Sequence, residues 1–518
     1  MSNRIAIVGG GLSGLVAAYE VGQQDPNADV VIFEASHRLG GKLKTVDIDA
    51  GSIDVGAEAY LAYRTDATEF FTSLGLHDRI RYPSNLTSGL WTGDGILHSV
   101  PSQTVMGIPS HSSSVNGLVE AETCDRIDAE GKAYPIPWNE GEDALIGSLV
   151  GARMGQQVVD HVVSPLLGGV YSTRADDLGL RATIPDLAAA MDDLVSDGEP
   201  VTLTGAAARV LRYRGGSREA RVAGGPADAD SSDILVKKPP VFASFVGGYR
   251  DVINALVDKT SANIQLNSPI LSVSRSNGTH RFSLVVGSAP PRDCGHAPIS
   301  HENSGVYLEG SMGGNNLEGD SPGRCEEFDA VIISTPADAA GRQLAEVAPV
   351  ASDIIGSVGL ASSVVLGLRL STDHGLPERT GILISPDAGL HAKAFTFSSR
   401  KWPHVADQVG TFIRASFGHW SDDSLVHEDK NILVTYALED LEAITGSRFH
   451  VEEAILQRWW GGLPRFGVGH DALISVATRE IEHIAGLEMA GATWRGVGVP
   501  DCIVQAREAA RKVMAQIG

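Results

Sequence analysis

The pattern of apolar and polar positions at the start of the chain predicts a strand, a helix and a second strand. Residues 4–8 form a short β-branched run, residues 15–21 repeat apolar side chains with helical spacing, and residues 30–33 form another apolar run. A glycine-rich turn joins the first run to the helix, and Glu34 ends the second run. This order is typical of a βαβ unit, whose two strands lie parallel in a buried sheet.

Later segments return to this sheet after long excursions. A helical pattern over 249–259 precedes a strand at 263–266, a strand with an apolar centre follows at 329–335, and a helix is expected over 503–517. Two more runs, at 364–370 and 431–436, predict strands of a separate sheet. The chain is therefore expected to pass back and forth between a first domain and a second one.

We expect an α/β fold with a Rossmann-like domain built on a parallel sheet, an α+β domain, and a mainly helical excursion. Two segments rich in Gly, Ser, Asp and Pro are expected to be variable surface loops. The predicted boundaries are 1–65, 241–275, 328–345 and 485–518 for the discontinuous Rossmann-like domain, 66–200 for the helical excursion, 346–484 for the α+β domain, and 201–240 and 287–327 for the loops.

Composition limits the class of protein and of partner. The 518 residues exceed one ordinary core, and 43% hydrophobic with 20% charged residues is typical of a soluble globular protein. Lys and Arg number 41 against 64 Asp and Glu, which gives a net charge of −23. A field of this sign repels polyphosphate, so it argues against nucleic acid as a partner. An acidic small molecule would need a local basic patch.

The cysteines and the N-terminus point to a cytoplasmic protein. The four cysteines have no metal-type spacing, which favours free thiols, and no metal site is expected. No charged region followed by an apolar stretch opens the chain, and no window reaches the length of a membrane span. Peripheral attachment to a membrane through an apolar surface stays open.

The turn after the first strand matches the dinucleotide-binding pattern GxGxxG at Gly9, Gly11 and Gly14. The first glycine permits the tight turn, the second lets a pyrophosphate approach the backbone, and the third lets helix and strand pack closely. A lone match is weak, because an ordinary glycine turn looks the same. Here Glu34 stands twenty residues after Gly14, where a carboxylate accepts hydrogen bonds from a ribose and disfavours the 2′-phosphate of NADP.

The segment that follows separates FAD from NAD. Glu34-Ala35-Ser-His-Arg38-Leu-Gly40-Gly41-Lys42 resembles the signature of the flavin amine oxidase and porphyrinogen oxidase superfamily, which NAD dehydrogenases do not carry. The competing interpretation is a glycine turn with a surface arginine. The resemblance implies that Arg38 supplies charge for the pyrophosphate of FAD, and that residues 56–59 line the isoalloxazine ring.

A second glycine-rich turn, at residues 490–503, precedes the C-terminal helix and resembles the porphyrinogen oxidase C-terminus. A helix N-terminus at this place would stabilise negative charge on a reduced flavin. The simpler alternative is a Gly-rich start of a helix. Together the motifs imply FAD contacts at Gly9, Gly10, Gly11, Leu12, Ser13, Gly14, Glu34, Ala35, Arg38, Gly41, Lys42, Gly56, Ala57, Glu58, Ala59, Ile270, Ala492, Trp494, Val497, Gly498 and Val499.

The block Pro165-Leu-Leu-Gly-Gly-Val-Tyr171-Ser172, with Arg181 in the segment after it, resembles protoporphyrinogen and coproporphyrinogen oxidases, and the likeness spans nearly the whole chain. Two departures concern substrate contacts: Ser172-Thr-Arg174 stands where the family has Ala-Gly-Asp, and Gln505-Ala-Arg replaces Ser-Gly-Arg. The variants in this chain resemble the actinobacterial branch, which the resemblance links to coproporphyrinogen III.

The resemblance implies oxidation of a porphyrinogen, with the flavin taking a hydride from a methylene bridge and molecular oxygen accepting the electrons to give hydrogen peroxide. It implies no catalytic side chain. A porphyrinogen is a large apolar macrocycle with acidic arms, so its site needs apolar walls and a few cations. Candidate walls are Tyr171, Leu383 and Trp402, and candidate cations are Arg64, Arg174, Arg181 and Lys401, each of which has core packing or a solvated surface as its simpler explanation.

Several alternatives remain from the sequence. Protoporphyrinogen IX is the alternative substrate, and a flavin amine oxidase is the alternative enzyme. A different class of function is a non-catalytic FAD-binding protein that assists another enzyme of haem synthesis. A transient contact with a ferrochelatase, and either a monomer or a homodimer, are compatible with the sequence.

Overall fold

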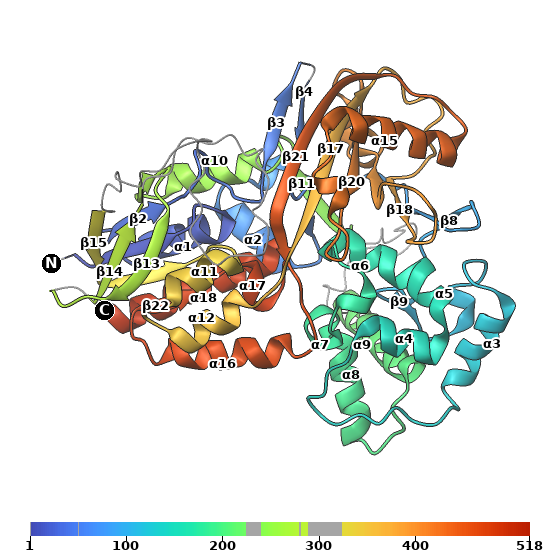
Figure 1. The fold of residues 1–518 in the computed structure, drawn as a ribbon, viewed down its shortest axis with the longest axis horizontal. Helices are drawn as coiled ribbons and strands as arrows, with labels where there is room; N and C mark the ends of the chain where they lie inside the picture. The colour runs from blue at the N-terminus through green and yellow to red at the C-terminus, as the bar shows by residue number, and fades with distance from the viewer. Residues whose placement is uncertain (1, 50, 224–239, 279–280, 288–323) are drawn as a thin grey trace, which may run out of the picture.

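The structure, a computed structural model, describes residues 2–49, 51–223, 240–278, 281–287 and 324–518. Figure 1 shows a layered domain that carries both chain ends, a large sheet beside it, and a group of helices at the lower right. Much of the two predicted loops therefore lies outside the described residues.

A parallel sheet of five strands forms the centre of the first domain, in the order β12-β2-β1-β16-β22. Ile5 of β1 lies opposite both Val30 of β2 and Ala330 of β16. The strands come from the start, middle and end of the chain, as the Rossmann-like prediction requires, and the predicted α/β fold is confirmed. Their bounds are β1 (Arg4–Val8), β2 (Asp29–Phe33), β12 (Asn263–Gln265), β16 (Ala330–Ile333) and β22 (Leu487–Met489).

Two layers cover this sheet because its strands are apolar on both faces. Ile5 and Ile7 pack into one hydrophobic cluster, while Ala6 and Val8 pack into another on the opposite face, as strand alternation dictates. The first cluster includes residues of the helices α1 (Leu12–Gln24), α10 (Arg250–Lys259) and α18 (Val499–Ile517). The second includes residues of β13 (Ile270–Arg275), β14 (Phe282–Val286), β15 (Arg324–Phe328), α11 (Ala337–Leu344), α12 (Pro349–Gly356) and α16 (His470–Glu482).

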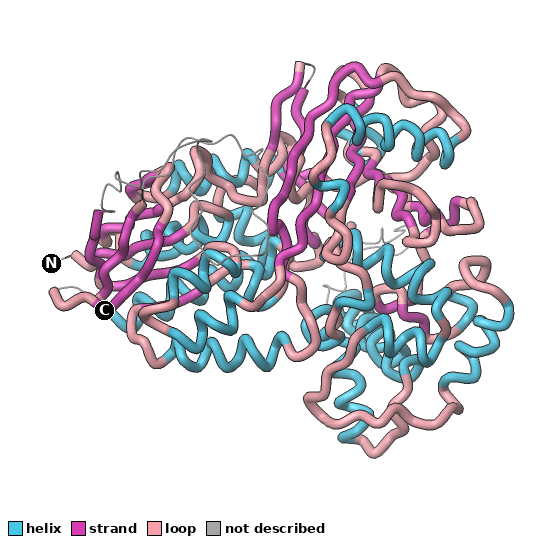
Figure 2. The backbone as a smooth tube through the Cα atoms, in the orientation of Figure 1, coloured by secondary structure: helices cyan, strands magenta, loops and turns pink. Residues whose placement is uncertain are grey.

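A mixed sheet of seven strands forms the second domain, in the order β21-β17-β20-β19-β18-β7-β8. Figure 2 shows its longest strands rising from the centre of the molecule. Leu383 of β18 lies opposite Leu90 of β7, so a segment close to the N-terminus enters this sheet by parallel pairing. The strands are β7 (Gly89–Trp91), β8 (Leu97–Ser99), β17 (Leu360–Leu370), β18 (Gly381–Ile384), β19 (Ala394–Thr396), β20 (Thr411–Phe417) and β21 (Val451–Pro464).

The helical part packs around a core of its own. Its elements are β9 (Thr104–Val105), β10 (Ile108–Pro109), α3 (Ala121–Glu130), α4 (Ile146–Met154), α5 (Gln156–Val158), the π-helical turn η3 (Val159–Val163), α6 (Ser164–Tyr171), α7 (Leu180–Thr183), α8 (Pro185–Ser196) and α9 (Leu203–Ala223). Among the residues that the structure describes, no helix combines the length and the apolar character needed to cross a bilayer.

Short elements connect the three parts. They are β3 (Thr45–Ile48), β4 (Gly51–Asp54), β5 (Tyr60–Leu61), α2 (Thr65–Ser73), β6 (Ile80–Arg81), β11 (Phe242–Phe245), α13 (Ser398–Lys401), α14 (Pro403–Ala406) and α17 (Ala492–Arg495). The longer helix α15 (Lys430–Thr445) packs on the large sheet, in one hydrophobic cluster with β17 and β20. β3 and β4 form a hairpin, and β11 pairs with both β5 and β6.

The predicted strand at 431–436 is wrong, because this segment begins helix α15. Its apolar residues Leu433, Ala437 and Leu441 are four apart and buried, and the Asp429 side chain accepts a hydrogen bond from the backbone of Asn431 at the helix start. Helical spacing over a longer window outweighs the local β-branched run.

The predicted loop at 201–240 is wrong over its first half. Helix α9 occupies it, since Leu203, Ala206, Ala207 and Val210 are buried at helical spacing. Strand β15 likewise lies at the end of the second predicted loop, and β7 and β8 lie inside the segment predicted as mainly helical. Segments 224–239 and 288–323 lie outside the described residues.

Candidate functional site

The glycine turn between β1 and α1 has the geometry that a pyrophosphate needs. Gly9 adopts φ +106°, and a Cβ placed on Gly14 would lie 1.9 Å from the Gly9 carbonyl oxygen. Ser334, which follows β16, donates its hydroxyl to the Val8 and Gly9 carbonyls at 2.9 and 3.1 Å. The turn thus exposes backbone next to the N-terminus of α1, where Leu12 and Ser13 begin the helix.

Glu34 lies at the end of β2 beside this turn. One carboxylate oxygen accepts from the Gly10 backbone at 2.7 Å, and the other accepts from the Ser36 backbone at 2.8 Å. Ala35 separates Glu34 from Ser36 along the chain. A carboxylate has room for about four hydrogen bonds, so each oxygen keeps a site for a ribose hydroxyl. The Glu34 carbonyl accepts from Ser268, which brings the buried Ile270 close to the same end of the sheet.

A second glycine turn lies against the first. The Gly40 backbone donates to the Gly10 carbonyl at 2.8 Å, and a Cβ on Gly41 would lie 3.1 Å from Cα of Gly11. Arg38 donates its guanidinium to the Gly41 and Leu39 carbonyls, at 2.6 and 3.1 Å. The two turns form a cradle of bare backbone, and Arg38 holds the shape of that cradle.

The segment after β4 continues this cradle. A Cβ on Gly56 would lie 2.0 Å from the Lys42 carbonyl oxygen, and the Ala57 backbone donates to that oxygen at 3.3 Å. Burial lowers the pKa of Lys42, whose charge interacts with Cys502 of α18. Residues 56–59, with Ala59 at their end, therefore run beside the glycine turns and the start of α18.

Glu58 forms a buried ion pair on the far side of that segment. Lys401 approaches Oε2 at 2.8 Å, Ser398 donates to Oε1 at 2.8 Å, and Arg414 lies 3.8 Å from Oε1. Burial acts to raise the pKa of Glu58, but the charges of Lys401 and Arg414 lower it to about 2. Glu58 therefore fixes the segment to α13 and the large sheet.

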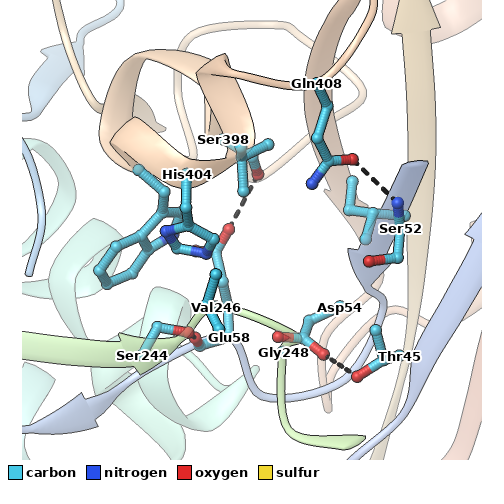
Figure 3. A pocket seen from close by; sticks show the side chains of 13 residues that line it. Thr45, Ser52, Asp54, Glu58, Ser244, Val246, Gly248, Ser398, His404 and Gln408 are labelled. Carbon is cyan, nitrogen blue, oxygen red and sulfur yellow. Dashed lines mark hydrogen bonds between the residues drawn. The ribbon is translucent and has the colours of Figure 1, made fainter. Parts of the chain in front are cut away.

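A small polar pocket, drawn in Figure 3, lies beside this ion pair. The Asp54 carboxylate faces it and accepts from the Thr45 hydroxyl at 2.5 Å, and the imidazole of His404 faces it from α14. Burial raises the pKa of Asp54 to about 7 and lowers that of His404. The pocket therefore lies next to residues 56–59, the segment that is expected to contact the flavin.

The C-terminal turn completes the cradle. A Cβ on Gly491 would lie 3.8 Å from the Ser13 hydroxyl, and the Cys502 thiol shares a hydrogen bond with Ser13. Ala492 packs on the same cluster as α1, and Val497, Gly498 and Val499 lead into α18. The N-termini of α1 and α18 therefore meet.

Trp494 differs from the other predicted contacts. Its indole is buried in the cluster on the opposite face of the sheet from α1.

This set of residues fits FAD. The cradle has no side chain in the path of a pyrophosphate, a carboxylate lies where a ribose would bind, and the N-terminus of α18 faces the turn that the flavin would touch. Added Cβ atoms would collide with backbone at Gly14 and Gly56, which shows that close approach is built into these positions.

The predicted substrate residues separate into two groups. Tyr171 of α6 and Leu383 of β18 lie near each other, since both pack on the helical core and a Cβ on Gly169 would lie 3.2 Å from the Leu383 side chain. Burial raises the pKa of Tyr171 to about 12, and its hydroxyl donates to the Thr183 carbonyl at 3.3 Å. The structure brings these two side chains together, and the pocket wall that they were expected to form stays a prediction.

The other wall and three of the candidate cations lie elsewhere. Trp402 is 1% exposed inside a core cluster, so it cannot form the wall of a wide site. Lys401 pairs with Glu58, Arg64 bridges Asp66 and Asp501, and Arg181 pairs with Asp192. These charges are already compensated by carboxylates.

Arg174 instead joins a cationic group that the sequence does not reveal. Its guanidinium lies 3.2 Å from Nε2 of His419, and Lys393 donates to the Ser172 hydroxyl at 2.7 Å. Burial lowers the pKa of Lys393 to about 7, and burial with the charges of Arg174 and Lys393 lowers that of His419 to about 4. Arg174 and Lys393 supply the positive charge, while His419 is neutral near pH 7 because its Nε2 accepts from Arg174; we call these three residues the cationic cluster.

Sequence reasoning missed Lys393, His419 and Ser334. Lys393 lies in a loop between β18 and β19 with no motif around it. The one available signal was Ser172, whose replacement of a family alanine marks a changed neighbourhood; it adopts φ +50° at the end of α6. Pairing across more than two hundred residues cannot be read from local pattern.

Comparisons with known proteins agree with this geometry. Residues 12–514 match the family model for flavin containing amine oxidoreductase. The chain is 32% identical to a coproporphyrinogen III oxidase of Mycobacterium leprae, covering 100% of this chain and 99% of the other, and 31% identical to one of Mycobacterium tuberculosis, covering 98% and 96%. These full-length relatives confirm the resemblance that the motifs predict.

A solved structure shares the fold. It is a protein of Exiguobacterium, provisionally assigned as a protoporphyrinogen oxidase, with a TM-score of 0.76, 24% identity and coverage of 99% of each chain. With the family match and the cradle described above, this chain belongs to the flavin-containing amine oxidoreductase family and is an FAD-dependent oxidoreductase.

Proposed function

We propose that this chain oxidises coproporphyrinogen III to coproporphyrin III in haem synthesis, with molecular oxygen as the acceptor and hydrogen peroxide as the product. The observation that supports this substrate is the cationic cluster of Arg174, Lys393 and His419 at the end of α6. Clustered cations suit a macrocycle with a propionate on every pyrrole. The relatives named as coproporphyrinogen III oxidases support the same choice.

Bound FAD supplies the redox chemistry by accepting a hydride from a methylene bridge, and the chain supplies position and charge. Glu34 and the glycine cradle hold the cofactor, and the start of α18 stabilises negative charge at the flavin. Tyr171 and Leu383 offer apolar surface to the macrocycle, while the cationic cluster orients its carboxylates. Orientation of one bridge carbon is the main contribution expected from these side chains.

The test is porphyrin fluorescence of the FAD-loaded protein in air, with coproporphyrinogen III and protoporphyrinogen IX side by side and enzyme-free samples to correct for autoxidation. We expect faster oxidation of coproporphyrinogen, with hydrogen peroxide formed in proportion. Faster oxidation of protoporphyrinogen would reverse the substrate.

Failure with both porphyrinogens would overturn the proposal. Turnover of a primary amine would then favour an amine oxidase, and a flavin that neither compound reduces would favour a non-catalytic FAD-binding protein. A ferrochelatase contact, peripheral membrane attachment, a cytoplasmic location and the choice between monomer and homodimer stay predictions from the sequence.

A further inference from the structure

The segment that joins strand β21 to helix α16 lies where the three parts of the molecule meet. β21 belongs to the large sheet and α16 covers the parallel sheet, and Figure 1 shows α16 extending toward α7 of the helical part. The Gly179 backbone of the helical part donates to the Phe466 carbonyl at 2.7 Å. The Gly469 backbone donates to the carboxylate of Asp143, which precedes α4, at 2.8 Å. This segment is therefore bonded to the helical part while it connects the other two parts.

Three buried rings are in contact at this segment. The ring centroid of Phe466 lies 5.9 Å from that of Tyr171 in α6 and 4.5 Å from that of His470, the first residue of α16. Phe466 is 1% exposed and His470 is 4% exposed. We call Tyr171, Phe466 and His470 the aromatic row. Because close-packed interiors transmit displacements, the end of α6 and the start of α16 are held at a fixed separation.

The far end of the aromatic row is bonded to the C-terminal turn. Nε2 of His470 lies 3.0 Å from the Thr493 carbonyl oxygen, which can only accept, so the imidazole donates. Burial lowers the pKa of His470, so the ring is neutral near pH 7 and this bond uses its one N–H. Thr493 belongs to α17, a single helical turn whose last carbonyls have no partner inside the helix. His470 supplies a partner that α17 itself cannot.

We propose that His470 is a positioning residue for the hydride transfer, and that it fixes the distance between the Tyr171 side chain and the turn that holds the flavin. It reaches Tyr171 through Phe466, and it holds the expected flavin contacts of residues 492–499 through the Thr493 carbonyl. Orientation of the substrate carbon against the flavin depends on both connections. This role rests on the proposed function, in which Tyr171 faces the substrate.

Two substitutions separate the two connections of His470. His470→Phe keeps a ring beside Phe466 but removes the donor to the Thr493 carbonyl. His470→Gln removes the ring but keeps an N–H that extends about as far from the backbone as Nε2 of histidine. A purely structural role predicts that both variants lose the same properties, whereas a positioning role predicts that each variant loses a different one.

The connection to the flavin is tested without any substrate. FAD release on dilution of the FAD-loaded protein is followed by fluorescence, and the flavin absorption spectrum is recorded before dilution. His470→Phe should raise the dissociation constant of FAD about tenfold and shift the absorption bands, because the buried Thr493 carbonyl loses its partner. His470→Gln should keep the spectrum and stay within about threefold of the unchanged protein.

The connection to the substrate is tested by steady-state kinetics at saturating FAD, with whichever porphyrinogen or amine the unchanged protein oxidises. His470→Gln should raise KM about fivefold with little change in kcat, because Tyr171 loses the support of the aromatic row. His470→Phe should instead lower kcat about fivefold with little change in KM, because the flavin turn is displaced. Phe466→Leu should behave as His470→Gln does, and it replaces that variant should His470→Gln fail to fold.

The matched controls are His483→Phe and His483→Gln. His483 is an exposed histidine at the other end of α16, and its ring donates to the Arg479 carbonyl of the same helix. Both controls should keep the FAD affinity, the flavin spectrum and the kinetics of the unchanged protein.

Two results would overturn the role of His470. One is an FAD affinity and a flavin spectrum in His470→Phe that match those of the unchanged protein. The other is the same loss of FAD in His470→Phe and His470→Gln, which would indicate a purely structural role. No turnover of any porphyrinogen by the unchanged protein would overturn the proposed function, and the FAD measurements on the two variants would still decide the role of His470.

Discussion

The ammonium of Lys401 lies 2.8 Å from Oε2 of Glu58, in an ion pair whose side chains are 18% and 11% exposed. Glu58 belongs to the segment that is expected to touch the flavin, and Lys401 ends α13. The pair therefore ties the cofactor domain to the large sheet. Its burial makes the removal of one partner costly.

We predict that Lys401→Met lowers the free energy of unfolding by about 3 kcal/mol, because Glu58 keeps its charge without that partner. Urea titration of the FAD-loaded protein measures it. Arg448→Met is the control, since its ion pair with Glu442 is exposed and should contribute less than about 0.5 kcal/mol. Adding Glu58→Gln to Lys401→Met should restore part of the stability. An equal loss of stability in Lys401→Met and in the control Arg448→Met would contradict the prediction.

Glu58 also predicts acid sensitivity. Its pKa is lowered from 4.5 to about 2 in the folded chain, so its contribution is complete above 4.5 and is lost as pH falls toward 2. The thermal midpoint of the unchanged protein should drop over that range more steeply than that of Glu58→Gln. Parallel curves for the two proteins would show that the ion pair contributes nothing.

Two glycines in one helix give a matched test of the cradle. Gly14→Ala places a Cβ 1.9 Å from the Gly9 carbonyl oxygen, so the turn must open and FAD should be lost on gel filtration. Gly22→Ala meets its nearest atom at 3.9 Å and should stabilise α1 by about 0.5–1 kcal/mol. Retention of flavin by Gly14→Ala would contradict the assignment of this turn.

Glu34→Gln should weaken FAD binding about tenfold or more, because the new amide cannot accept from both the Gly10 and Ser36 backbones and from a ribose. Flavin release on dilution, followed by fluorescence, measures this loss. Glu346→Gln changes an exposed carboxylate and should keep its flavin. Equal release from the two variants would mean that Glu34 does not hold the cofactor.

Lys393 predicts a pH-dependent preference for carboxylates. Because burial lowers its pKa to about 7, its ammonium is charged below that pH and neutral above it. We expect kcat/KM for coproporphyrinogen to fall as pH rises through 7, and this step to disappear in Lys393→Met, which should also raise KM. Arg379→Met is the control, since Arg379 is half-buried and donates a hydrogen bond to the Thr87 hydroxyl, away from the cationic cluster. A Lys393→Met enzyme with the same pH profile would place the substrate elsewhere.

Local pattern predicted the turns that form the cradle. Gly9 to Gly14, Glu34 and the turn before α18 belong to short motifs, because tight turns and close approach restrict residue type within a few positions. The parallel sheet followed from the same segments. The spacing of apolar residues also placed α10 and β16 close to their observed bounds, whereas β17 begins earlier than predicted, at Leu360.

Side-chain partners could not be predicted in the same way. Lys401 was expected to hold a propionate, but Glu58, more than three hundred residues earlier, compensates its charge. Trp402 was expected in a pocket wall, yet it is a core residue beside Ile53 and Phe412. Such partners are decided by how distant elements pack, which no local spacing records.

The order of strands in the parallel sheet sets when this protein becomes able to bind its cofactor during synthesis. Its neighbours β1 and β16 are separated by more than three hundred residues, and β22 and α18 are made after the other strands of the sheet and after α1. A nascent chain displays the first glycine turn long before the helix that completes it has been made. We therefore expect flavin to enter only after α18 has been made, and a chain cut before α18 to bind no flavin.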